Sequence, residues 1–364
     1  RFDLKGLEEV INKAQEILGH NDHVTEIISI FNTSLAHAST YNDFVFLWLN
    51  KIFGAYGVIV LNMDDSRFKK AFAPFIRKEI VERSSIDIVQ KTQDELANMA
   101  FRPQAFARDI NFFYMLDGLR ERIFFENDLY HVNHTDLVFS ESEILELISN
   151  YPERFSPNVI MRPLYQEFSL PNIAYIGGGG EIAYWLERKS QFDYFGIFFP
   201  VLIRRNSLML ITKAVQKTMD KPGITLHLLL KDESQMITEY LEYAAAADFH
   251  LAHEMEKINQ IFEEISDRAK IIDPTLGPFV LGEGHKVIKS IEAIEARLKK
   301  TIKNKEETAI NQLKNIRKKL FPENNLQERK DSFLQYLSVE GLQFQDEMVD
   351  LCDPLEKDFL FLYL

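Results

Sequence analysis

The stretch NIAYIGGGGEIAYW, residues 172–185, joins a short apolar run to an aromatic-rich run through four consecutive glycines. Strand, glycine-rich turn and helix in this order form the unit that places ligands at the carboxyl ends of parallel strands. We therefore predict a buried strand at 172–176 and a helix over 181–196 that ends at Gly196. Because glycine in an ordered element costs backbone entropy, four in a row need a reason.

Two interpretations of the glycines are open. In the first, bare main chain and the start of the following helix form a flat surface for an adenine or a ribose, whose hydroxyls bond to Glu181. In the second, the glycines only allow strand and helix to pack tightly. The spacing matches neither GxGxxG nor the P-loop with its lysine. The candidate nucleotide-binding residues are Gly177, Gly178, Gly179, Gly180 and Glu181.

Arginines flank the glycines in the sequence. Arg162 lies in MRPLYQE, and Arg204 and Arg205 interrupt the apolar run PVLIRRNSLMLI. A guanidinium binds carboxylate or phosphate through two parallel hydrogen bonds, although any single arginine can be a plain surface charge. Successive side chains on a strand point to opposite faces, so we expect only one of the tandem pair to line a site. Asn206 adds a small polar contact.

Composition narrows the class of protein. The chain has 364 residues, enough for two or three domains, and 46% of them are hydrophobic. The net charge of −13 repels nucleic-acid phosphate, so we interpret the basic run 296–320 as a solvated coiled-coil face. No apolar run is long enough to span a bilayer. A single cysteine, Cys352, fits a cytoplasmic protein without internal disulfides.

The first 232 residues alternate helical and strand-like segments, the pattern of an α/β domain. We predict helices in 1–18 and 24–37, and a buried strand at VIVLN, 58–62. Segment 110–132 predicts an antiparallel insertion with turns at DG and END, and the helix after it is capped by Ser140 or Ser142.

The remainder of the chain is helical in pattern. Residues 233–272 form one long helical run with apolar residues at alternating steps of four and three, which indicates a coiled-coil seam. DPTLGPF interrupts the pattern, and a second such run follows. We predict three parts: a core at 1–232, an antiparallel coiled-coil hairpin at 233–322 and a helical C-terminal segment at 323–364.

Common catalytic and metal-binding motifs are missing from the sequence. HLAHE places His250 and His253 three residues apart, whereas zinc-binding HExxH needs four. No GxSxG elbow anchors a hydrolase triad. The sequence therefore predicts no metal site and assigns no catalytic residue.

The longest motifs carry a family resemblance. IFGAYGVIVLNMDD, GLRERI, PERFSPNVIMRPLYQEFSLPNIAYIGGGGEIAYWLERK, PVLIRRNS and DPLEKDF together resemble the bacillithiol biosynthesis cysteine-adding enzymes, over nearly the whole chain. The resemblance implies a Rossmann-like core related to class I aminoacyl-tRNA synthetases, plus a coiled-coil domain that forms homodimers. It also implies an ATP-dependent ligase, with Mg²⁺ accompanying ATP, that joins L-cysteine to glucosaminyl-malate.

This resemblance supplies an interpretation of the site. The glycines and Glu181 match the position where the synthetases contact ribose, and a dicarboxylate such as malate gives the arginines a ligand. The candidate substrate-binding residues are Arg162, Tyr165, Gln166, Tyr184, Arg204, Arg205 and Asn206.

One departure from the family pattern affects this interpretation. Family members carry TGQQ-type and EDHD-type motifs that this sequence lacks, so the chain resembles the C-terminal two-thirds of a member, with the first Rossmann half missing. The fragment is then expected to have an incomplete ATP site and to be inactive alone. The alternative function is a non-catalytic module that binds adenine nucleotide and dimerises through its hairpin.

Overall fold

The structure is a computed structural model that describes residues 4–221, 223–245 and 250–364. The chain forms two compact units, Arg1–Asn206 with Phe333–Asp358, and Ser207–Ser332 with Phe359–Leu364. The division therefore falls at Asn206 rather than at the predicted residue 232. The reason is that α10 (Lys213–Met219) and α11 (Leu226–Leu230) bury their apolar side chains in the core of the second unit.

Helices from the N-terminal and the C-terminal ends of the first unit's sequence contact each other. As predicted, the N-terminal part is helical: α1 (Leu7–Leu18), α2 (Asp22–His37) and α3 (Tyr41–Phe53). Asn21 caps α2 by accepting a hydrogen bond from the Val24 N–H, and its side-chain amide donates to the Ser338 carbonyl at 2.9 Å. Ser338 lies in α16 (Leu334–Glu340), which α17 (Phe344–Leu351) follows.

The predicted strand at 58–62 is wrong. After the short helix η1 (Gly54–Tyr56) the segment is irregular, and Val58 and Ile59 are 48% and 71% exposed. A strand is stable only where a neighbouring strand accepts its backbone hydrogen bonds, and none of the described strands pairs with this segment. The chain then forms α4 (Ser66–Glu82), capped by Asp65, which is followed by α5 (Ser85–Asn98).

The predicted antiparallel insertion is confirmed as a five-stranded sheet of order β4-β3-β2-β1-β5. Two tight turns set its register, because Gly118 has a φ of 76° and Asn127 and Asp128 are also left-handed. The predicted cap, Ser140, begins α6 (Glu141–Asn150). The strands are β1 (Phe112–Leu116), β2 (Leu119–Glu126), β3 (Leu129–Val132), β4 (Val138–Phe139) and β5 (Phe155–Pro157), which follows η2 (Pro152–Arg154).

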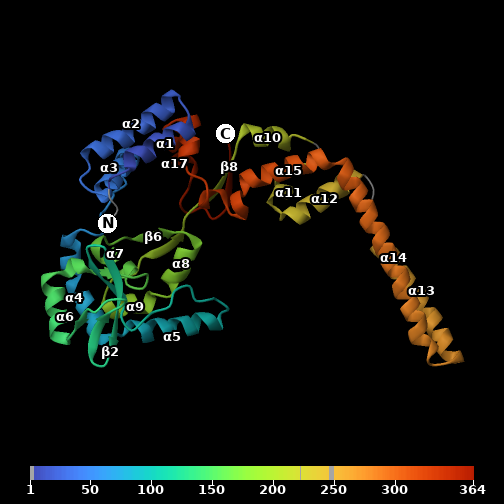
Figure 1. The fold of residues 1–364 in the computed structure, drawn as a ribbon, viewed down its shortest axis with the longest axis horizontal. Coiled ribbons are helices and arrows are strands. Elements are labelled where there is room, and N and C mark those ends of the chain that lie inside the picture. The colour runs from blue at the N-terminus through green and yellow to red at the C-terminus, as the bar shows by residue number, and fades with distance from the viewer. Residues whose placement is uncertain (1–3, 222, 246–249) are drawn as a thin grey trace. The chain divides into compact units, whose positions relative to one another are not determined.

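The glycine-rich segment has the predicted strand–turn–helix order. β6 (Ala174–Gly177) pairs in parallel with β7 (Val201–Arg204), and α7 (Arg162–Ser169) precedes the pair. The single helix predicted over 181–196 is divided into α8 (Gly179–Leu186) and α9 (Lys189–Phe195), which Gly196 ends at a φ of 69°. Trp185 and Phe192 bury these helices in the core of the unit, and Figure 1 shows α8 and α9 following β6.

The second unit combines a parallel strand pair with helices. β8 (Ser207–Ile211) pairs with β9 (Phe359–Tyr363), so the predicted helical tail contains a strand at its end. Alternating Phe359 and Phe361 pack on the core, which explains why this segment is extended. The same core is formed by α10, α11, α12 (Glu233–Ala245) and α15 (Glu307–Leu320); η3 (Pro322–Asn324) and η4 (Gln327–Arg329) follow α15.

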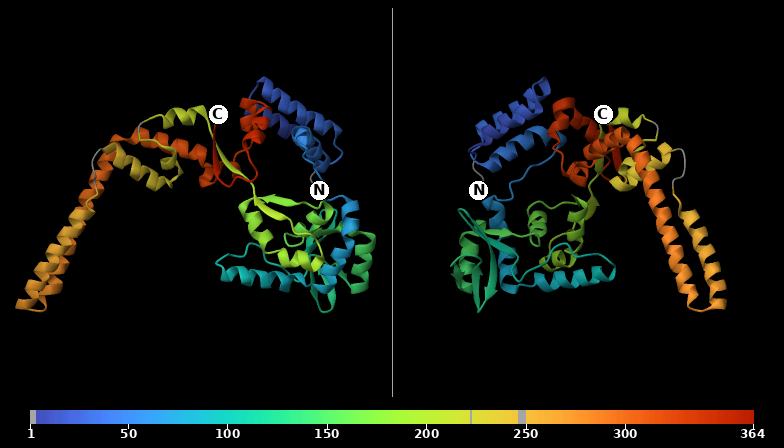
Figure 2. Two further views of the ribbon diagram at one scale, coloured as in Figure 1. Left: turned by 180° about the vertical axis from the view of Figure 1, so that it is seen from behind. Right: turned by 45° about the vertical axis from the view of Figure 1, so that its right-hand side comes forward.

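A long antiparallel hairpin is formed by α13 (Ala252–Ile272) and α14 (Leu276–Lys305), which lie side by side in every view of Figures 1 and 2. It is shorter than the predicted hairpin at 233–322, because α12 and α15 bury their apolar faces in the second core. The predicted continuous helix 233–272 is interrupted, since His250 and Leu251 are not helical; residues 246–249 of that prediction lie outside the described residues.

Two glycines of α14 give a test of the hairpin. A Cβ on Gly284 would lie 2.8 Å from Cγ of Phe262 on α13, whereas a Cβ on Gly282 meets no atom within 4 Å. Alanine at either position gains roughly 1 kcal/mol of helix propensity. We expect Gly282→Ala to keep this gain and Gly284→Ala to lose it to overpacking, so that the two differ by about 1–3 kcal/mol in free energy of unfolding. Urea titration measures both, and equal stabilities would contradict the close approach.

Candidate functional site

A cavity of about 260 Å³ opens beside the glycine-rich turn in the first unit. Its walls come from α5, from the segment that follows α5, from α8 and from the end of β7. Most of the lining side chains are apolar, with charged groups at a few positions. The lining residues are Gln93, Leu96, Phe101, Arg102, Pro103, Gly179, Ile182, Ala183, Leu186, Glu187 and Arg204.

The glycines have different roles in the structure. A Cβ on Gly177 would lie 2.7 Å from the ring of Tyr175, so this glycine is required by packing. A Cβ on Gly179 or Gly180 would meet no atom within 4 Å, and Gly179 lines the cavity. None of the four glycines has a positive φ. Packing therefore explains Gly177, whereas Gly179 presents bare main chain to the cavity.

The N-terminus of α8 is capped by the side chain of Glu181. The carboxylate of Glu181 accepts a hydrogen bond from the Gly178 N–H at 2.8 Å, which is the helix-capping arrangement. Its expected bonds to ribose would compete with this cap. The remaining N–H groups of the first turn lie at the positive end of the helix dipole and favour an anionic group.

Of the tandem arginines, only Arg204 at the end of β7 lines the cavity. Arg204 is exposed, lines the cavity and donates from Nη2 to the Lys357 carbonyl at 2.5 Å. Arg205 is not among the lining residues, and its backbone N–H donates to the Gly177 carbonyl. Asn206 donates to the Asp353 carbonyl at 2.7 Å, away from the cavity lining.

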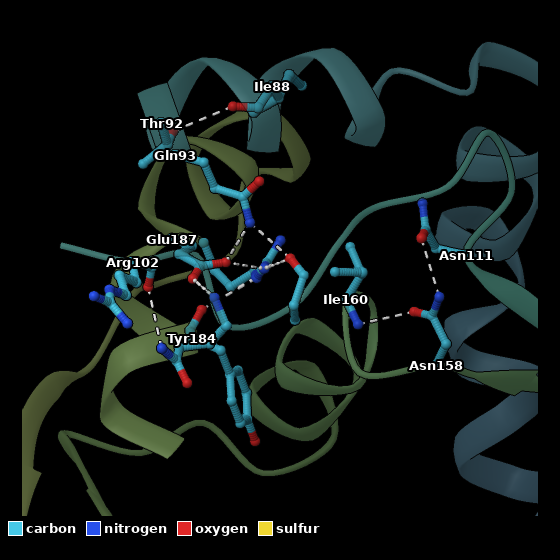
Figure 3. Close-up of polar contacts among 12 residues, drawn as sticks. Ile88, Thr92, Gln93, Arg102, Asn111, Asn158, Ile160, Tyr184 and Glu187 are labelled. Atoms are coloured by element: carbon cyan, nitrogen blue, oxygen red, sulfur yellow. Dashed lines mark hydrogen bonds and ion pairs between the residues drawn. The ribbon is translucent and has the colours of Figure 1, made fainter. Parts of the chain in front are cut away.

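Beneath the cavity lies a buried ion pair between neighbouring residues. Glu187 is 2% exposed and Arg188 is fully buried, with Nη2 and Oε2 2.8 Å apart. Gln93 points from α5 toward Glu187 and donates to the same carboxylate at 2.7 Å, as Figure 3 shows. The backbone N–H of Gln104 donates to the other carboxylate oxygen, also at 2.7 Å. Both oxygens of Glu187 are thus hydrogen-bonded.

Two carbonyls complete this cluster. Arg188 donates to the carbonyls of Tyr184 and Ala105, and Gln93 also donates to Ala105. Burial lowers the pKa of Arg188 to about 10, and the charge of Glu187 opposes that shift. At neutral pH the guanidinium is therefore charged. The cluster ties α5, residues 104–105 and the end of α8 into one frame around the cavity.

A second buried cluster stabilises the start of α5. Glu79 accepts hydrogen bonds from Ser85 at 2.5 Å and from Asn111 at 2.7 Å. Burial raises the pKa of Glu79 to about 7, partly offset by these two hydrogen bonds. Asn111 also accepts from the amide of Asn158, whose side-chain oxygen accepts from the Ile160 N–H, as Figure 3 shows.

The other predicted substrate-binding residues do not line the cavity. Arg162 is exposed at the first position of α7. Tyr165 is only 2% exposed, because its ring packs against Phe72 in the hydrophobic core. Its hydroxyl donates to the Met63 carbonyl at 2.7 Å. Gln166 is half-buried and bonds weakly to Glu167. Tyr184 packs at the edge of two apolar clusters. Of the predicted set, the cavity brings together Gly179 and Arg204.

Sequence reasoning missed Gln93, Glu187 and Arg188. A signal was present, because Trp185, Arg188 and Phe192 recur at helical spacing and therefore share one buried face. Gln93 follows the buried Val89 by four residues in the same way. A charged side chain on the apolar face of a helix is buried, and a buried charge needs a partner of opposite charge or hydrogen bonds.

Among the described residues, no group of three His, Cys, Asp or Glu side chains is arranged to hold a metal ion. None of the described helices combines the length and the apolar character that a membrane crossing requires.

The elements define an α/β protein whose second unit carries a long helical hairpin. The family model "Bacillithiol biosynthesis BshC, N-terminal Rossmann-like domain" matches residues 1–206, and the model of that family's C-terminal coiled-coil domain matches 208–364. The chain belongs to the BshC family of bacillithiol biosynthesis. The predicted family resemblance and fold class are thereby confirmed.

Curated relatives agree with this assignment. A Flavobacterium johnsoniae protein named "Putative cysteine ligase BshC" is 36% identical over 99% of this chain and 68% of its own length. Proteins of the same name from Christiangramia forsetii and Flavobacterium psychrophilum are each 34% identical, over 98% and 99% of this chain and 66% and 67% of their own lengths. The chain thus spans about two thirds of these relatives, and its matches include the N-terminal as well as the C-terminal domain model.

The buried ion pair is tested by removing its acidic member. We expect Glu187→Leu to lower the free energy of unfolding by about 3–5 kcal/mol, because it leaves Arg188 charged and unpaired. Glu187→Gln keeps an acceptor for the Gln104 N–H, so we expect it to lower the free energy of unfolding by less. The matched control is Asp193→Ala, which breaks the exposed Lys189–Asp193 pair and should change stability little. Denaturant titration measures all three, and similar losses for Glu187→Leu and Asp193→Ala would contradict the role of the buried pair.

Proposed function

We propose that this chain is an ATP-dependent ligase that joins the carboxyl group of L-cysteine to the amine of glucosaminyl-malate, the last step of bacillithiol biosynthesis. The support is the family membership, the name cysteine ligase carried by its relatives and the cavity at Gly179. ATP supplies the activation that a carboxylate needs before an amine can attack it. Because ATP is a cytoplasmic nucleotide, we place the reaction in the cytoplasm.

The observation that carries the nucleotide site is the bare main chain at Gly179. It borders a cavity of about 260 Å³ whose lining is mostly apolar, as the face of a flat ring system requires. Leu96, Phe101 and Ile182 offer apolar surface to a base. Arg102 and Arg204, also on the lining, supply positive charge for phosphate or carboxylate. The residues present therefore fit an adenine nucleotide.

Binding and positioning are what this chain's own groups contribute. The frame around Glu187 holds α5 and α8 at a fixed spacing, so that the cavity walls do not reorganise when a ligand enters. Arg204 retains guanidinium donors beyond the one that meets Lys357, and these can orient a substrate carboxylate. Holding two substrates together in this way accelerates a condensation mainly through proximity.

We also propose that the hairpin forms a homodimer. Large apolar side chains remain exposed on α13 and α14, among them Ile261, Ile265, Ile294 and Leu298. A row of such residues at coiled-coil spacing is typical of a surface that another helix covers. The family model for this part of the chain is a coiled-coil domain, which is compatible with that arrangement.

The proposed reaction is tested by product formation. The full-length protein is incubated with ATP, L-cysteine and glucosaminyl-malate, and mass spectrometry follows the condensed thiol. We expect the product only when all three substrates are present. ATP binding without product would contradict the ligase and favour the non-catalytic nucleotide-binding module.

The nucleotide site is tested by two neighbouring glycines. Gly179→Val places a branched side chain in the cavity, and we expect ATP affinity to fall by about tenfold or more, measured by calorimetry. The matched control is Gly180→Val, which changes the next residue of α8 but does not line the cavity. Thermal unfolding checks that both variants fold. Equal loss of affinity in the two variants would remove this cavity from the proposal.

A further inference from the structure

A groove of about 450 Å³ lies between α2 and α3 and shares no lining residue with the cavity at Gly179. Its lining residues recur at helical spacing on both helices, so that one face of each helix forms a wall. Most of the lining side chains are polar. The lining consists of Ser29, Ile30, Thr33, Ser34, His37, Leu47, Asn50 and Lys51.

The hydroxyl groups of this groove lack the partner that hydroxyls have on other helices of the protein. Thr92 on α5 and Ser149 on α6 each donate to the carbonyl four residues earlier in the same helix. In the described part of the chain, no group forms a hydrogen bond with the hydroxyls of Ser29, Thr33 and Ser34. These three hydroxyls are therefore free to bond to a molecule in the groove.

Ser34 is the most deeply buried of the three. It is only 5% exposed, yet it lines the groove. A buried hydroxyl that makes no hydrogen bond is costly in free energy, so its partner has to come from outside the chain. The groove is the side from which such a partner can reach it.

The charges of the lining have one sign. Lys51 and His37 lie in the last turns of α3 and α2, and no Asp or Glu lines the groove, although the net charge of the chain is −13. Nδ1 of His37 lies 2.8 Å from the Thr33 carbonyl, which can only accept, so Nδ1 carries a proton and Nε2 stays available. Basic residues in a last turn also suit the helix dipole, so the charges indicate a ligand only together with the unpartnered hydroxyls.

The lining follows an order along the groove. Only residues 38–40 join α2 and α3, so the two helices run antiparallel. The lining of α2 extends from Ser29 to His37, about 12 Å along the helix. Asn50 and Lys51 lie far from the connection and therefore at the Ser29 end, whereas His37 lies beside the connection. The groove thus has an ammonium group at one end, hydroxyls in the middle and an imidazole at the other end.

We infer that this groove binds a small phosphorylated polyol. The phosphate lies at Lys51, where Ser29 and Asn50 donate to its oxygens, and the polyol extends past Ser34 toward His37. A phosphate has several acceptor oxygens and suits neutral donors gathered around one lysine. A carboxylate is bound best by the planar fork of an arginine, which this lining lacks. The inference goes beyond the proposed function, because it concerns a separate site and holds whether or not the chain is a ligase.

Four probes separate the contributions of the phosphate and of the hydroxyls. D-Sorbitol phosphorylated at a terminal carbon has both, D-sorbitol lacks the phosphate, inorganic phosphate lacks the polyol, and D-gluconate carries a terminal carboxylate instead. Calorimetry or ligand-detected NMR on the whole chain measures their affinities. We expect the phosphorylated sorbitol to bind about tenfold more tightly than each of the others, because each lacks one set of contacts. Equal binding of D-gluconate or of inorganic phosphate, or no binding of phosphorylated sorbitol at about 20 mM, would overturn the inference.

Two variants locate the binding. Lys51→Met should weaken phosphorylated sorbitol by about tenfold, whereas Lys13→Met, at an exposed position of α1, should leave its affinity unchanged. Ser34→Ala should weaken it severalfold without lowering thermal stability, because the serine hydroxyl has no bond to lose within the described chain. The matched control is Ser149→Ala, which loses its bond to the Leu145 carbonyl and should leave the affinity unchanged.

A separate ATP titration distinguishes this groove from the candidate nucleotide site. We expect Lys51→Met to leave ATP affinity unaltered, since Lys51 lines only the groove between α2 and α3. An equal loss of ATP and of phosphorylated sorbitol in this variant would contradict a separate site. Binding of phosphorylated sorbitol that survives both Lys51→Met and Ser34→Ala would place the ligand elsewhere and refute the inference.

Discussion

A carboxylate that is removed from water must be fully hydrogen-bonded, and the candidate nucleotide site depends on how Glu187 meets that condition. Its partners come from three places: Arg188 beside it, Gln93 on α5 and the backbone of Gln104. Moving α5 or residues 104–105 away from α8 would leave a buried charge unpaired. Because an unpaired buried charge is costly in free energy, α5 and residues 104–105 stay against α8 and hold the walls of the cavity that Gly179 lines.

Different constraints apply to Gly177 and Gly179 in the glycine segment. Gly177 is needed because the ring of Tyr175, stacked on Trp185 at 3.9 Å, leaves no room for a Cβ. Gly179 has free space, so packing does not explain it, and we propose that a ligand lies against its main chain. The packing explanation therefore applies to Gly177, and the proposed ligand explanation to Gly179.

Much of the architecture was predictable from the sequence, because local signals agree with tertiary structure there. The DG turn at Gly118 and the cap at Ser140 act within a few residues. The failures depend on distant partners. VIVLN at 58–62 has strand composition but no pairing strand among those described, and β9 is extended because it pairs with β8. For the site, helical spacing could have indicated that Arg188 is buried, but spacing cannot show that Gln93 and Gln104 lie around the Glu187–Arg188 pair.

The candidate nucleotide site requires that a nucleoside lie against the main chain of Gly179. A crystal structure of the chain with a non-hydrolysable ATP analogue tests this most directly. We expect the base or ribose in van der Waals contact with the Gly179 backbone, between α5 and α8, with Glu187 and Gln93 still hydrogen-bonded beneath it. An analogue bound at another surface, with this cavity empty, would contradict the account.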